Sequence, residues 1–156
     1  MRARGFTLIE LVITVAIVGL LATAAFPLAQ MASRRAKEQD LRLALREIRG
    51  ALDRYKTSAD EGHVVLEVGQ TGYPPSLETL VDGVEDAKDP EAARIYFLRR
   101  LPRNPFFPDP AAEPAETWGL RSYASPPDDP QPGEDVFDVY PLTSGSGLNG
   151  VPYRDW

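Results

Sequence analysis

The chain of 156 residues contains no cysteine and only one histidine, His63. The lack of cysteine excludes a disulfide, a thiol nucleophile and any metal site built on thiolates. A lone histidine without a nucleophile or metal-ligand spacing around it gives no support to catalysis, and no glycine-rich phosphate loop or HExxH spacing is present. We therefore expect a protein that is not an enzyme and that needs no cofactor.

Charge is missing from one long stretch. Residues 11–33 are 23 consecutive residues without Asp, Glu, Lys, Arg or His. As a helix they would extend about 35 Å, enough to cross the hydrocarbon core of a bilayer. We expect a transmembrane helix over 6–33. The same stretch also fits a secretory signal peptide cleaved after Ala22-Thr23-Ala24, or a plain signal anchor.

The remaining charge is distributed unevenly. The net charge is −6, yet residues 1–37 carry five Lys and Arg against the single acidic residue Glu10. Residues 38–156 carry 12 basic and 22 acidic side chains. An acidic domain behind a basic, apolar N-terminus makes nucleic acid an unexpected partner.

The rest of the sequence predicts an α+β domain. Apolar residues recur at spacings of three and four after the apolar segment, which predicts an amphipathic helix. The two stretches together should form one long helix from about Phe6 to about Lys56, with only its second half amphipathic. The members of this apolar stripe are Leu41, Leu45, Ile48, Leu52 and Tyr55. Because the 15 prolines crowd into the second half, this half should be rich in ordered loops.

Several short elements are expected after the helix. The apolar run 63–68 predicts a strand, Ser76 is a candidate N-cap for a short helix, and 90–101 predicts a second short helix. The segments 118–124 and 136–142 predict strands. A small antiparallel sheet should therefore pack on the amphipathic half of the long helix, with strands around Tyr123 and Val139 covering the stripe.

The N-terminus carries a specific pattern: Met1-Arg-Ala-Arg-Gly5, then Phe6-Thr-Leu-Ile-Glu10, then the uncharged run. This pattern resembles the processing and assembly motif of the type IV pilin superfamily. Four later segments, in their order and spacing, narrow the resemblance to the major pseudopilins of type II secretion. These segments are 72–81, 98–105, 118–123 and 135–140.

The resemblance implies a pilin-like fold and a set of residue roles. A leader, 1–5, would be cleaved between Gly5 and Phe6, and the new amine of Phe6 would be methylated. Glu10 would direct subunit assembly, while Gly19 and Pro27 would give the helix flexibility. The helix 6–33 would form the membrane span and filament core, and 34–156 the periplasmic head with the amphipathic half of the helix.

A function and partners also follow from the resemblance. It implies a self-assembling subunit of a type II secretion pseudopilus that drives protein export across the outer membrane. The chain would be a single-pass protein of the bacterial inner membrane, with its N-terminus in the cytoplasm and its head in the periplasm. The expected partners are further copies of itself in a helical filament, prepilin peptidase, minor pseudopilins, the inner-membrane assembly platform and the lipid bilayer. Two alternatives remain, a type IV pilus subunit for adhesion, motility or DNA uptake, and a membrane-anchored periplasmic binding module.

Many major pseudopilins bind calcium in the loop after the last strand. In this chain that loop, 143–151, offers only Asn149 as a strong side-chain oxygen ligand. Calcium takes six to eight oxygen ligands, carboxylates among them. We therefore expect little calcium dependence. The carboxylates that could still contribute from outside the loop are Asp135, Asp138 and Asp155.

Overall fold

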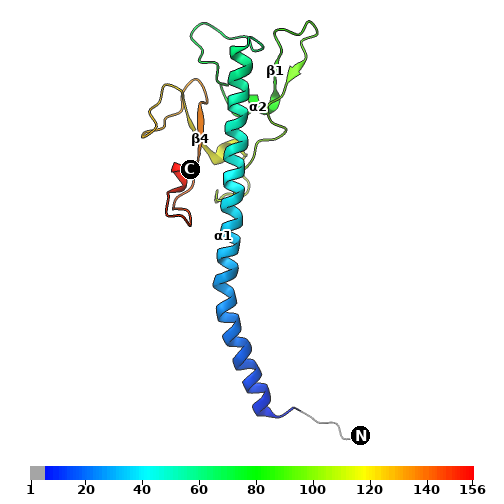
Figure 1. Cartoon of the computed structure of the whole chain (residues 1–156), viewed down its shortest axis with the longest axis vertical. Helices are drawn as coiled ribbons and strands as arrows, with labels where there is room; N and C mark the ends of the chain where they lie inside the picture. The colour runs from blue at the N-terminus through cyan, green and yellow to red at the C-terminus, as the bar shows by residue number, and fades with distance from the viewer. Residues whose placement is uncertain (1–5) are drawn as a thin grey trace. The chain divides into compact units, whose positions relative to one another are not determined.

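The structure is a computed structural model that describes residues 6–156, without the side chain of Ala24. One helix, α1 (Leu8–Asp60), is followed by short elements joined by long ordered loops (Figure 1). The chain divides into two units, Met1–Lys37 and Glu38–Trp156, and α1 contributes to both. The other elements are α2 (Thr79–Asp82), β1 (Val84–Glu85), β2 (Arg94–Ile95), η1 (Ala115–Thr117), β3 (Trp118–Arg121), β4 (Asp138–Pro141) and η2 (Tyr153–Asp155).

The apolar stripe of α1 forms the centre of the core in the second unit. All five predicted members are at most 4% exposed, and Ala44, Ala51 and Ala59 extend the same face. Burying one Leu or Ile side chain contributes about 1.5–3 kcal/mol, so tertiary packing stabilises this half of the helix. The predicted helix is confirmed, and it continues to Asp60 rather than Lys56.

Two antiparallel pairs of strands follow. β3 pairs with β4, with Trp118 opposite Pro141 and Arg121 opposite Asp138, and β1 pairs with β2. The predicted α+β class is therefore confirmed. Both predicted strands of the larger pair are present but shorter than expected. β3 ends at Arg121 because the amide of Ser122 donates to Gln131 O and leaves the ladder.

The stripe is covered by residues from every part of the second unit. Val139 of β4 is fully buried against it, as expected, whereas Tyr123 is 59% exposed and the expectation for that residue was wrong. Tyr123 instead stacks on the ring of Tyr73, with centroids 5.9 Å apart. The other buried apolar side chains of this core are Val64, Leu77, Leu80, Phe97, Leu98, Trp118, Val136 and Tyr153.

The predicted strand at 63–68 does not form. Val65 is 78% exposed and Val68 is fully exposed, so these apolar side chains have no sheet face to join. The amide of Gln70 donates to Glu67 O, and the amide of Glu67 donates to the side chain of Gln70. A local turn thus bonds the amide and the carbonyl of Glu67, which a neighbouring strand would otherwise have bonded.

Both short-helix predictions need correction. α2 begins only at Thr79, so Ser76 is not its N-cap, and its hydroxyl lies 3.3 Å from that of Thr79. The segment 90–101 is not helical, since Ala92 has a φ of 52° and β2 pairs with β1. The amides of Phe97 and Leu98 donate to Leu80 O. These long-range bonds favour a hairpin over a helix.

Candidate functional site

The N-terminal end of α1 carries the predicted assembly residues. Gly5 lies outside the described residues, and Phe6 is 87% exposed just before the helix. The hydroxyl and the amide of Thr7 both donate to Glu10 Oε2, at 3.0 and 3.1 Å, while the amide of Glu10 lies 3.3 Å from the hydroxyl of Thr7. This reciprocal arrangement is a capping box, which satisfies amides that no helical carbonyl can reach.

The capping box was not predicted, although its sequence signal was present. Thr7-Leu-Ile-Glu10 has the spacing of a Ser or Thr followed three residues later by Glu, immediately before an apolar run. In the structure Glu10 therefore has a local role, because it fixes the start of the helix. Any test of an assembly role for Glu10 must separate its charge from this cap.

The uncharged part of α1 presents apolar side chains outward. α1 is the one helix among the described residues that is long and apolar enough to cross a membrane. It is unbroken at Gly19 and at Pro27, so neither residue ends the helix, and their predicted flexibility stays a prediction. The exposed apolar side chains include Leu11, Val15, Val18, Leu21, Phe26 and Leu28. Such a surface is suited to lipid or to a second apolar helix, not to water.

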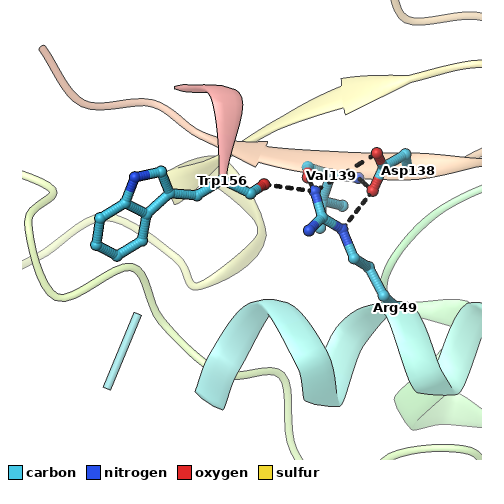
Figure 2. Close-up of polar contacts among 4 residues, drawn as sticks. All are labelled: Arg49, Asp138, Val139 and Trp156. Atoms are coloured by element: carbon cyan, nitrogen blue, oxygen red, sulfur yellow. Dashed lines mark hydrogen bonds and ion pairs between the residues drawn. The ribbon is translucent and has the colours of Figure 1, made fainter. Parts of the chain in front are cut away.

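The segment after β4 is held to α1 by two charged side chains. Arg49 donates from Nε to Asp138 Oδ1 at 2.7 Å and from Nη2 to the main-chain oxygens of Val139 and Trp156, at 3.1 and 2.9 Å (Figure 2). Glu38, which is 5% exposed, accepts bonds from the amide of Leu148 and the hydroxyl of Tyr153, at 2.8 and 2.9 Å. We call these contacts the C-terminal clamp. Charge-assisted hydrogen bonds are the stronger kind, so the clamp should order this segment.

The ring of Trp156 completes the clamp. It packs at 5.1 Å from the ring of Tyr153, and the guanidinium of Arg42 lies over it at 4.3 Å. A Cβ atom at Gly147 would collide with this ring, so only glycine fits there. No local pattern in the sequence indicates the contact of Arg42 with Trp156, because these residues lie more than 100 positions apart.

The four candidate calcium ligands have separate partners. Asp138 binds Arg49, Asn149 Oδ1 accepts the amide of Val151, and Asp155 lies 3.7 Å from Arg154. Asp135 binds the hydroxyl of Thr71 and the amide of Tyr123. Among the described residues, no group of three or more His, Asp or Glu side chains could hold a metal ion.

Asp135 is a structural carboxylate. Burial raises its pKa, but the hydrogen bonds from Thr71, Tyr123 and Ser122 outweigh this effect and hold the pKa below its usual value. Its ionised form therefore stabilises the fold at neutral pH. That contribution is lost as the pH falls through the lowered pKa of the folded state.

Removing the guanidinium of the clamp should loosen the C-terminal segment. In Arg49→Ala, Asp138 and the oxygens of Val139 and Trp156 lose their donor. We expect the free energy of unfolding of the head to fall by about 1–2 kcal/mol, and no more because the site is partly exposed to water. Hydrogen–deuterium exchange of the detergent-extracted chain should show faster exchange over residues 142–156. Arg46→Ala is the matched control, since Arg46 is exposed on the same helix. Unchanged exchange in Arg49→Ala would contradict the clamp.

Comparisons with known proteins agree with the N-terminal pattern, and one of them covers most of the chain. Residues 1–26 match the family model described as the prokaryotic N-terminal methylation motif. The chain is 30% identical over 112 residues to the type II secretion system core protein G of Klebsiella pneumoniae, a match that covers 69% of this chain and 72% of that protein. No solved structure matches the chain significantly. With the methylation motif, the long N-terminal helix and this match over more than two thirds of the sequence, the chain belongs to the type II secretion core protein G family, the pseudopilins of the type IV pilin superfamily.

Proposed function

We propose that this pseudopilin is the self-assembling subunit of a type II secretion pseudopilus that drives protein export across the outer membrane. The observation that carries the proposal is the match to a type II secretion core protein, which covers more than two thirds of both chains. It is a proposal for a structural role and not a catalytic one. The one histidine supports a structural role. His63 Nδ1 lies 2.8 Å from Asp86 Oδ1, a contact that joins two loops.

The same proposal assigns a place in the cell and a set of partners. The exposed apolar face of α1 supports a single pass through the inner membrane, with the leader in the cytoplasm and the head in the periplasm. Prepilin peptidase would remove the leader after Gly5. Minor pseudopilins and the inner-membrane assembly platform would then incorporate the mature subunit into a filament.

Deleting the gene separates export from the functions of a type IV pilus. The source bacterium should lose its secreted enzymes from the medium and accumulate them in the periplasm, because the filament subunit is missing. Quantitative mass spectrometry of the two fractions measures this, with the restored gene as control. Unchanged secretion together with lost twitching motility or DNA uptake would instead support a type IV pilus subunit.

A further inference from the structure

A groove of about 380 Å³ lies between α1 and the C-terminal segment in the second unit. Its helical wall carries Arg42, Arg46 and Arg49, at spacings of four and three that place them on one face. Its opposite wall is formed by Asn149, Val151, Asp155 and the indole of Trp156. We call this the arginine groove.

The three arginines differ in what they already bind. Arg49 is engaged by Asp138 and by main-chain oxygens, and Arg42 lies over the ring of Trp156. Arg46 is exposed and makes no ion pair or side-chain hydrogen bond within residues 6–156. The groove therefore presents an uncommitted guanidinium beside a partly exposed indole, and Asp155 supplies the single acidic side chain among its described lining residues.

The rest of the head offers the opposite charge. Residues 61–156 carry 17 acidic and 7 basic side chains. The loop 126–134, Pro-Pro-Asp-Asp-Pro-Gln-Pro-Gly-Glu, contains four prolines, three carboxylates and no basic residue. Asp128, Asp129 and Glu134 of this loop are all exposed.

This loop is ordered before it meets any partner. The hydroxyl of Ser125 donates to Asp129 O and accepts from the amide of Gln131, at 3.2 and 2.8 Å, and the Gln131 amide side chain donates to Asp129 Oδ1 at 2.9 Å. Prolines also fix the φ angle, so little conformational entropy is lost on docking. Proline-rich segments commonly bind grooves lined by aromatic side chains, and carboxylates pair with guanidinium groups.

Within one copy the loop belongs to a different surface. Pro126 and residues 131–134 line a larger groove of about 1380 Å³, and no residue of the loop lines the arginine groove. We infer that the arginine groove of one copy receives the acidic, proline-rich loop 126–134 of a second copy. This inference rests on the proposed function, because it gives the self-assembling head a specific contact. Since groove and loop are different surfaces, the contact is head-to-tail and can propagate along a filament.

A cysteine pair tests the contact directly, because the natural chain has no cysteine to interfere. The full-length double variant Arg46→Cys/Asp128→Cys, assembled in membranes and oxidised, should give a ladder of disulfide-linked multimers. Each single variant should give dimers at most. Arg99→Cys/Asp128→Cys is the matched control, since Arg99 is an exposed arginine that does not line the groove.

A charge exchange distinguishes the loop from any other occupant. Arg46→Asp and Asp128→Arg should each reduce the number of filaments about tenfold, because like charges then meet, and combining them should restore assembly. Asp109→Arg, in the other proline-flanked acidic loop, should assemble normally. Loss of assembly in Arg46→Asp without rescue by the double variant means that another partner fills the groove, which overturns the inference.

Failure of the inference and failure of the proposed function give different results. If the unmodified chain forms filaments but the cysteine pair gives no ladder, the proposed contact is wrong and the proposed function stands. A chain that forms no filaments in cells that still export their enzymes contradicts the proposed function, and the contact falls with it.

Discussion

Glu10→Ala is expected to abolish filament assembly while cleavage of the leader and insertion into the membrane continue. On insertion scales an ionised carboxylate costs about 3 kcal/mol at the centre of a bilayer. Glu10 lies in the first turn of α1, at the edge of the uncharged segment, where a nearby cation should neutralise its charge. The amine that the expected cleavage would expose on Phe6 is the natural partner. If the amine belongs to the next subunit, the ion pair recruits that subunit and sets its axial register.

Two further variants separate the charge of Glu10 from its capping role. Glu10→Gln can still cap the helix but carries no charge, whereas Thr7→Ala removes the cap and keeps the charge. The intersubunit account predicts that Glu10→Gln fails to assemble and that Thr7→Ala assembles. Filaments can be counted by electron microscopy after immunoblotting for the processed form. Normal filaments from Glu10→Gln would refute the account and leave a pairing within one subunit or the cap as the role of Glu10.

Leu52→Asp is expected to unfold the head. Leu52 is 1% exposed in the middle of the apolar stripe, where a carboxylate would have no partner. Burying an unpaired charge costs about 4 kcal/mol or more, a large part of the stability of a small domain. A soluble fragment starting at Met31 should be monomeric and show a cooperative thermal transition by circular dichroism, and this transition should be lost in the variant.

Leu43→Asp is the matched control for this experiment. Leu43 lies on the same helix but is 55% exposed, so a carboxylate there stays in water. We expect its melting temperature to stay close to that of the natural sequence. Equal stability of both variants would show that the stripe does not face the core.

The long helix and its buried face could be predicted because they depend on local periodicity. Leu41, Ile48 and Leu52 recur at helical spacing, and each is at most 1% exposed in the structure. The strands at β3 and β4 were also predictable, since the segments around them carry the aromatic residues Trp118 and Tyr140 and, in β4, the β-branched Val139. The end of β3 was not, because Ser122 leaves the ladder to bond with Gln131, a contact between loops.

The features that could not be predicted from the sequence depend on long-range contacts. The segment 90–101 was expected to form a helix, yet the amides of Phe97 and Leu98 bond to Leu80 O and the chain forms a hairpin. The clamp formed by Glu38 and Arg49 joins the helix to residues about 100 positions later in the chain. Local sequence patterns cannot predict contacts over that separation. The cap between Thr7 and Glu10 is the exception, because its spacing was readable in the sequence.

A mass spectrum of the protein extracted from its native membrane tests the central claim, that this chain is a processed pilin-type subunit. We predict an N-terminus at Phe6 with one added methyl group on its amine. Cleavage there removes Arg2 and Arg4, which lowers the net charge of the mature chain from −6 to −8. An intact N-terminus beginning at Met1, or one beginning at Ala25 after signal-peptide cleavage, would contradict the claim.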